Sequence, residues 1–88
     1  MRNPPVTGGQ VELADQESGR VVVRADDGMH ACILLSAWVR LQVGARVTWE
    51  HALPNYGTLT SAGGHPVPYD LALWGMTADE ARAWFESA

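Results

Sequence analysis

Residues 18–28 read Ser-Gly-Arg-Val-Val-Val-Arg-Ala-Asp-Asp-Gly, and residues 29–36 continue as Met-His-Ala-Cys-Ile-Leu-Leu-Ser. Each segment contains a run of aliphatic and β-branched residues of the kind found in strands. An Asp-Gly pair lies between the two runs, and this placement favours a tight hairpin because glycine adopts a positive φ without steric cost. We therefore predict a β-hairpin with strands at residues 20–24 and 30–35.

Alternation of apolar and polar residues predicts three further strands, at residues 10–14, 45–51 and 58–60. In the first of these strands, Val11 and Leu13 are expected to share one face. In the second, the alternation places Trp49 in the core. Five short strands separated by turns are typical of a small closed or nearly closed barrel.

The C-terminal part of the sequence contains a helix signal. The run Thr77-Ala-Asp-Glu80 matches a capping box, in which each of the two end residues accepts a backbone N–H from the other. We predict a loop at residues 61–68 and a helix at residues 78–87. A helix of about ten residues is marginal alone in water, so its apolar stripe must dock on the barrel or on a partner. The residues of that stripe are Ala81, Trp84, Phe85 and Ala88.

Composition limits the possible functions. The chain has 88 residues, enough for one small domain, and a formal net charge of −4 from ten acidic residues against six arginines. This acidic balance disfavours tight binding of nucleic-acid phosphates. Cys32 is the only cysteine, which excludes an intrachain disulfide and a cysteine-rich zinc site. Because no apolar run suits a signal peptide or a membrane span, we expect a cytoplasmic protein.

No residue pattern points to catalysis or to a cofactor. His30 and Cys32 stand two apart on one predicted strand and so on one face, as zinc ligands can. The remaining histidines, His51 and His65, do not supply a second close pair. Cys32 lies among aliphatic residues in mid-strand, where a buried and unreactive thiol is usual. We therefore predict no catalytic residue, no cofactor and no metal site.

Residues 18–28 resemble the second strand and turn of the cold-shock domain, a nucleic-acid-binding member of the OB-fold class. The family reads there roughly Lys-Gly-Phe-Gly-Phe-Ile, two variable residues and Asp-Gly. Residues 30–37, His-Ala-Cys-Ile-Leu-Leu-Ser-Ala, are similar to its third strand, Asp-Val-Phe-Val-His-Phe-Ser-Ala. Residues 41–50, Leu-Gln-Val-Gly-Ala-Arg-Val-Thr-Trp-Glu, resemble its Leu, Gly, Val and Phe-Glu spacing.

This resemblance covers residues 10–62 and implies an OB-like barrel of five strands. The predicted fold is therefore mainly β, with a C-terminal α-helix. A flexible N-terminal arm at residues 1–9 precedes the barrel. A loop and the helix, at residues 63–88, follow it and pack on the barrel or on a partner.

The resemblance also implies a change of function. Cold-shock domains stack bases on aromatic rings that project from the outer faces of their second and third strands, and stacking contributes about 1–3 kcal/mol per base. None of the matching positions in this chain holds a ring; they are Arg20, Val22, Cys32 and Leu34. The apolar patch that results is typical of a contact surface. Either the C-terminal helix covers it with Trp84 and Phe85, or another chain does, including a second copy in a homodimer.

We therefore predict a non-enzymatic binding module, a small acidic adaptor or inhibitor of phage or mobile-element type that binds a protein of a nucleic-acid-handling machine. The predicted partner-binding residues are Arg20, Val22, Cys32, Leu34, Trp38, Arg40, Trp84 and Phe85. In the alternative, the chain binds single-stranded DNA or RNA. The residues of that alternative are Arg20, Arg24, Trp38, Arg40 and Arg46. The loop that carries Trp38 is equally consistent with a lid over the barrel end.

Overall fold

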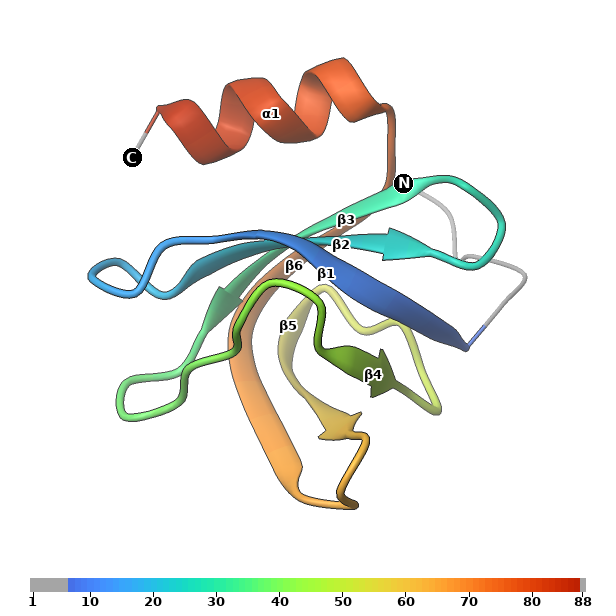
Figure 1. The fold of residues 1–88 in the computed structure, drawn as a ribbon, viewed down its shortest axis with the longest axis vertical. Coiled ribbons are helices and arrows are strands. Elements are labelled where there is room, and N and C mark those ends of the chain that lie inside the picture. Colours follow the sequence, from blue (N-terminus) through green and yellow to red (C-terminus); the bar gives the residue numbers. More distant parts are fainter. Residues whose placement is uncertain (1–6, 88) are drawn as a thin grey trace.

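The hairpin predicted at the Asp-Gly pair joins the second and third strands of a computed structural model that describes residues 7–87. Gly28 has a φ of 88°, and its N–H donates to the carbonyl of Ala25, which closes the turn. The chain in this range forms the following elements (Figure 1): β1 (Gly8–Ala14), β2 (Arg20–Ala25), β3 (His30–Leu35), β4 (Arg46–Thr48), β5 (Asn55–Ser61), β6 (Pro66–Met76) and α1 (Ala78–Glu86).

The strands form a closed barrel in the order β1-β2-β3-β6-β5-β4, and β4 pairs back onto β1. Every neighbouring pair is antiparallel. The prediction of a mainly β barrel followed by a C-terminal helix is confirmed. The prediction of five strands is wrong, because β6 adds a sixth between β3 and β5 within the described residues.

Strand β6 begins inside the segment that was predicted to be a loop at residues 61–68. Pro66 and Pro68 lack the N–H that a strand ladder uses, so the sequence there does not resemble a strand. In the structure, they pair with Thr60 and Thr58 of β5. The following residues of β6 pair with both β3 and β5, so this strand connects the two halves of the barrel.

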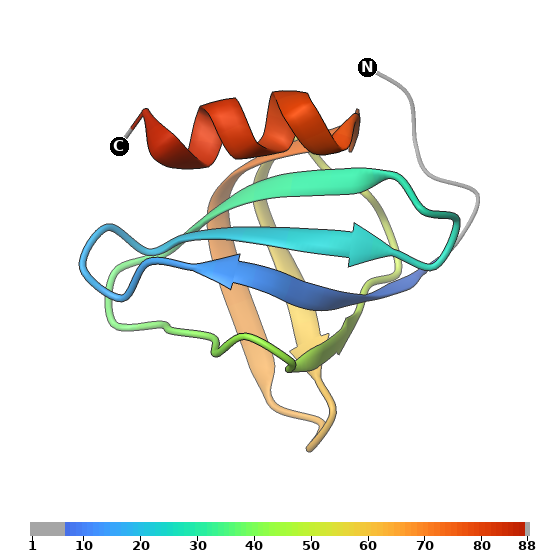
Figure 2. The same ribbon diagram turned by 45° about the horizontal axis from the view of Figure 1, so that its top comes forward.

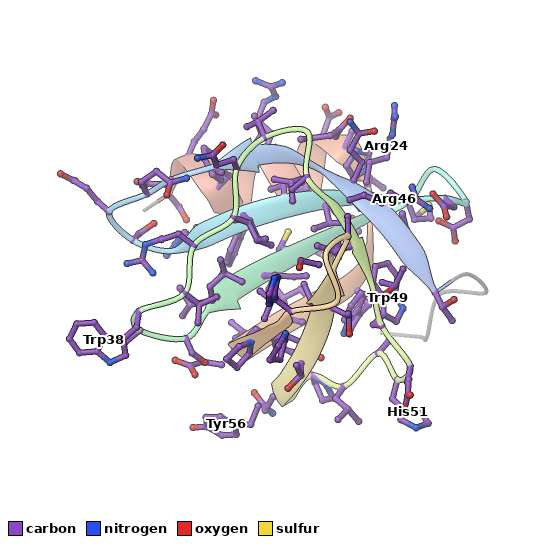
Figure 3. All side chains as sticks on the ribbon, turned by 60° about the horizontal axis from the view of Figure 1, so that its bottom comes forward. Arg24, Trp38, Arg46, Trp49, His51 and Tyr56 are labelled. Atoms are coloured by element: carbon purple, nitrogen blue, oxygen red, sulfur yellow. The ribbon has the colours of Figure 1, made fainter. Side chains whose placement is uncertain are left out.

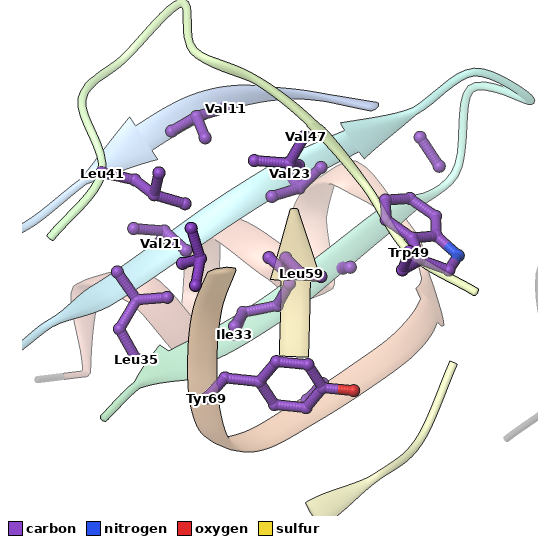
Figure 4. Packing of buried hydrophobic residues seen from close by; sticks show 14 of the residues in the cluster. Val11, Val21, Val23, Ile33, Leu35, Leu41, Val47, Trp49, Leu59 and Tyr69 are labelled. Carbon is purple, nitrogen blue, oxygen red and sulfur yellow. The ribbon is translucent and has the colours of Figure 1, made fainter. Parts of the chain in front are cut away.

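The barrel interior is filled by aliphatic residues together with aromatic residues such as Trp49 and Tyr69 (Figure 4). Trp49 enters this core as predicted, with its ring centroid 4.8 Å from that of Trp74. The Tyr69 hydroxyl and the Trp74 indole N–H both donate to the carbonyl oxygen of Leu53, at 2.7 and 2.9 Å. A Cβ on Gly57 would stand 2.2 Å from the Tyr69 hydroxyl oxygen, so only glycine fits there.

Helix α1 lies along the outside of β2 and β3 (Figure 2). Its capping box is confirmed: the Glu80 N–H donates to Thr77 Oγ1 at 3.2 Å, and the Thr77 N–H donates to Glu80 Oε1 at 2.9 Å. The helix covers a second, outer apolar cluster. The members of this cluster are Val22, Cys32 and Ala81, with Leu13, Leu73, Met76, Trp84 and Phe85 packed around them.

The prediction that Val11 and Leu13 share a face is wrong. Val11 lies in the barrel core, whereas Leu13 packs against the outer cluster under α1. The pairing of β1 with β2 shifts between these two residues, which makes Glu12 the extra residue of a β-bulge. The bulge breaks the alternation that the prediction assumed and leaves both Glu12 and Leu13 on the outer side of the sheet.

Several element boundaries also differ from the prediction. Strand β1 begins at Gly8, inside the predicted arm at residues 1–9, and residues 1–6 lie outside the described residues. Strand β4 has three residues instead of the seven predicted at 45–51, while β5 is longer than the predicted 58–60. Ala88, the last residue of the predicted helical stripe, also lies outside the described residues.

Candidate binding surface

The face that was predicted, from the sequence resemblance, to correspond to a base-stacking surface is covered by the chain's own helix. Val22 and Cys32 lie beneath α1 with 1% and 0% of their surface exposed, and Leu34 beside them is half-buried. Val22 and Cys32 therefore do not form an open contact surface here, and of the two alternatives the structure shows cover by the helix. Burial, with a smaller contribution from the charge of Glu80, raises the pKa of the Cys32 thiol to about 11.

Arg20 holds the end of α1 against β2. Its Nη1 donates to the carbonyl oxygen of Trp84 and to the Ser87 hydroxyl, and its guanidinium lies 4.7 Å from the centroid of the Trp84 ring. Phe85 packs on the same outer cluster. Arg20, Trp84 and Phe85, predicted to meet a partner, are therefore used to attach the helix to the barrel.

Two of the other predicted arginines also bind groups of their own chain. Arg40 Nε donates to the backbone carbonyl of Gln16 at 2.6 Å, which fastens the loop after β3 to the turn after β1. Arg46 makes two hydrogen bonds to the carboxylate of Asp26, and this contact lowers the pKa of Asp26 and raises that of Arg46.

The last two arginines lie near carboxylates on the outer side of the barrel. Arg24 stands 3.8 Å from Glu12, and Arg82 stands 4.0 Å from Glu86 one helical turn away. Between residues 7 and 87, Arg20, Arg40 and Arg46 therefore donate hydrogen bonds to their own chain, whereas Arg24 and Arg82 only lie within ion-pair distance of a carboxylate. The described part of the molecule presents no unpaired basic stripe.

Trp38 is the one predicted binding residue whose ring is open to solvent, with 98% of its surface exposed. It lies in a turn closed by the hydrogen bond from the Val39 N–H to the Ser36 carbonyl, at 3.1 Å. Its φ of 79° makes it the third residue of a type II turn, a position that glycine normally occupies. The Trp38 ring itself does not cover the barrel (Figure 3), but Val39 and Leu41 of the same loop pack on the barrel core.

Tyr56 is a second exposed ring, and it was not among the residues predicted from the sequence. It is 82% exposed, and its φ of 53° is also in the left-handed region. Asn55 pairs with Leu71 and Gly57 pairs with Tyr69, which places Tyr56 opposite Asp70 across the β5–β6 ladder. Figure 3 shows the Tyr56 side chain projecting away from the barrel, as that of Trp38 does.

Asp70 is associated with the segments that carry both aromatic residues. Its Oδ1 accepts a hydrogen bond of 2.8 Å from the hydroxyl of Ser36, the first residue of the turn that carries Trp38. The ladder places Tyr56 on its other flank. We call the group of Ser36, Trp38, Tyr56 and Asp70 the aromatic surface. It combines two exposed rings with one exposed carboxylate.

A groove of about 540 Å³ lies elsewhere, between the outer side of β1–β3 and the first turns of α1. The bulge in β1 places Glu12 on its wall, where Oε1 lies 2.8 Å from His30 Nε2. His30 Nδ1 is buried without a hydrogen-bond partner. Asp79 and Arg82 line the opposite wall, so acidic and basic groups are mixed along the groove.

Residues 7–87 were also searched for clusters of metal-binding side chains and for helices that could span a membrane. In that range no three His, Cys, Asp or Glu side chains gather as a metal site would require. The helix of the described chain is also too short and too polar to cross a bilayer.

Comparisons with protein-family models, with curated proteins and with solved structures found no match. The resemblance to cold-shock domains therefore stays a prediction from the sequence. The barrel itself is compatible with many functions, so the aromatic surface is the feature from which a function can be argued.

Proposed function

We propose that this chain is a non-enzymatic protein-binding module, an adaptor or inhibitor that meets its partner through the aromatic surface. The observation that carries the proposal is the placement of Trp38. A non-glycine residue in the left-handed region costs about 1–2 kcal/mol, and the exposed ring returns no packing energy to the barrel. A large ring kept at such a position supports a role in binding.

The identity of the exposed residues supports a protein partner. Tryptophan and tyrosine are enriched at the energetic centres of protein interfaces, where they supply a large contact area with few rotatable bonds. Asp70 accepts a hydrogen bond from Ser36 in the Trp38 turn and lies opposite Tyr56 in the β5–β6 ladder. With a net charge of −4 for the whole chain, the proposed partner presents a basic surface, as proteins that handle nucleic acids often do.

The alternative function, binding of single-stranded DNA or RNA, has Trp38 in its favour as a platform for one base. The arginines predicted to bind the phosphates argue against this alternative. Arg20, Arg40 and Arg46 all donate to acceptors of their own chain. A phosphate would have to break those hydrogen bonds, and the Asp70 carboxylate, which is bonded to Ser36 of the Trp38 turn, would repel it. The alternative is therefore the weaker of the two.

Two parallel experiments test the proposed function. In the first, wild-type chain and Trp38→Gly are immobilised and exposed to the same cell extract, with Val43→Ala, a change at another exposed apolar residue, as control. We expect one protein to be retained by the wild type and the control and lost by Trp38→Gly. In the second, a single-stranded oligonucleotide is titrated at low salt. Submicromolar binding that weakens steeply with salt would overturn the proposal in favour of the alternative.

A further inference from the structure

Asp70 is an exposed carboxylate that the folded chain does not neutralise. Its one side-chain hydrogen bond is with Ser36, and none of the ion pairs within residues 7–87 includes it. The Ser36 hydroxyl donates to Oδ1, which fixes the carboxylate and leaves its other oxygen available. The site is therefore a negative charge held in a defined orientation by Ser36, two residues before Trp38 in the chain, and opposite Tyr56 in the β5–β6 ladder.

Exposed aromatic rings together with a carboxylate favour binding of a cation, and of a guanidinium in particular. A cation above the face of an aromatic ring is attracted by the ring's quadrupole, most strongly with tryptophan, and a guanidinium also stacks flat on the ring. A carboxylate within reach adds a charge-assisted hydrogen bond, which is about twice as strong as a neutral one. Trp38 and Tyr56 supply the rings, and Asp70 supplies the carboxylate.

We propose that the aromatic surface captures an arginine side chain from an exposed, extended segment of the partner protein. This inference rests on the proposed function and names the chemistry of the partner. The positive φ of Trp38 and that of Tyr56 are consistent with it, because both side chains project away from the barrel (Figure 3) and Asp70 is itself exposed.

Other occupants fit this surface less well. A nucleic-acid backbone carries phosphates, which the Asp70 carboxylate repels. A second copy of this chain would have to bring an arginine from residues 7–87. Three of these arginines would lose hydrogen bonds to their own chain, and the other two would have to leave a carboxylate of their own chain at 3.8 or 4.0 Å. A partner that carries an arginine on a free segment avoids both difficulties.

The first test measures binding of a fluorescein-labelled hexa-arginine peptide by fluorescence anisotropy. Three full-length proteins are compared: wild type, Asp70→Asn, and Asp27→Asn as the control. The two variants have the same net charge, and Asp27 lies in the β2–β3 turn, at the other end of β3 from Trp38. We expect Asp70→Asn to weaken binding by about tenfold and Asp27→Asn by less than about twofold. Equal weakening by both variants would show a response to net charge alone and would overturn the inference.

A second variant keeps the charge and removes a ring. Tyr56→Asn is chosen because asparagine tolerates the left-handed backbone conformation of this position. We expect it to weaken hexa-arginine binding by about fivefold, with an unfolding transition close to that of the wild type. Unchanged binding would remove Tyr56 from the site. Tight binding of oligothymidylate, with no binding of hexa-arginine, would replace the inference by nucleic-acid binding.

The same variants separate this inference from the proposed function. If Trp38→Gly loses the captured protein but Asp70→Asn retains it, the aromatic surface binds a protein without recognising an arginine, and only the inference fails. If Trp38→Gly retains that protein, the proposed function fails. If both variants lose it while Asp27→Asn retains it, both proposals are supported.

Discussion

Arg20 contacts Trp84 in two ways, with its guanidinium over the indole ring at 4.7 Å from the centroid and its Nη1 donating to the Trp84 carbonyl oxygen. The carbonyls of the last helical turn lack partners within the helix, and a cation there interacts favourably with the helix dipole. Within the last turn of α1 there is no basic residue. Arg20 of β2 therefore supplies from the barrel the positive charge that the last turn of the helix does not contain.

The first prediction concerns Arg20→Ala. Loss of the ring contact and of the hydrogen bonds should weaken docking of α1 by about 1–2 kcal/mol. Cys32 is fully buried under this helix, so its reaction with a thiol reagent in the native state reports how often the helix opens. We expect labelling of Cys32 to become about tenfold faster. Arg82→Ala, which removes only an exposed pair with Glu86, is the control and should leave the rate nearly unchanged.

The second prediction concerns Gly57→Ala. The added Cβ would stand 2.2 Å from the Tyr69 hydroxyl oxygen, and that hydroxyl is fixed by its bond to the Leu53 carbonyl. We expect a loss of about 2–3 kcal/mol in the free energy of unfolding, measured by urea denaturation. Gly63→Ala adds the same methyl group in an open loop, where the nearest atom is 3.2 Å away on the His65 ring. Similar losses in the two variants would contradict the packing described here.

The third prediction concerns pH. The hydrogen bond from Arg46 lowers the pKa of Asp26 from its usual 3.8. A carboxyl group whose pKa is lower in the folded state stabilises the fold above its unfolded pKa, and this contribution is lost as the pH falls through the folded pKa. Asp26→Asn should therefore be less stable than the wild type at neutral pH. The difference should shrink between about pH 5 and pH 2. A difference that stays constant over this range, in denaturation curves measured at each pH, would contradict the ion pair.

Local signals in the sequence predicted part of this fold well. The Asp-Gly turn placed β2 and β3 almost to the residue, because two uninterrupted β-rich runs flank it. The capping box placed the start of α1 correctly, because the two hydrogen bonds require residues at fixed spacing. Trp49 was assigned to the core because the residues around it alternate cleanly.

Other elements depend on contacts that no local pattern contains. Strand β6 was missed at Pro66 and Pro68, since its pairing with β5 exists only once the barrel closes. Leu13 was assigned to the wrong face because a bulge changes the alternation after Val11. Cover of Val22 and Cys32 by the helix was one of two open alternatives, and choosing between them required the tertiary structure.

The sequence predicted one aromatic residue of the candidate site and missed the other. Trp38 was named from the sequence, but its turn position and its exposure depend on the hydrogen bond between Ser36 and Val39. Tyr56 was overlooked because Asn-Tyr-Gly reads as an ordinary turn, and only pairing with β6 places it opposite Asp70. The sequence signal that could have identified Tyr56 was an aromatic residue directly before a glycine in a turn-like segment.

The most direct test of the central claim is the effect of Trp38→Gly on two quantities in the same protein, the free energy of unfolding and the affinity for the captured partner. Glycine adopts the φ of 79° without strain, although it adds entropy to the unfolded chain. We predict that the free energy of unfolding stays within about 1 kcal/mol of the wild type while the affinity falls at least about tenfold. A variant that unfolds much more easily but still binds its partner would show that Trp38 serves the fold, and would contradict the proposal.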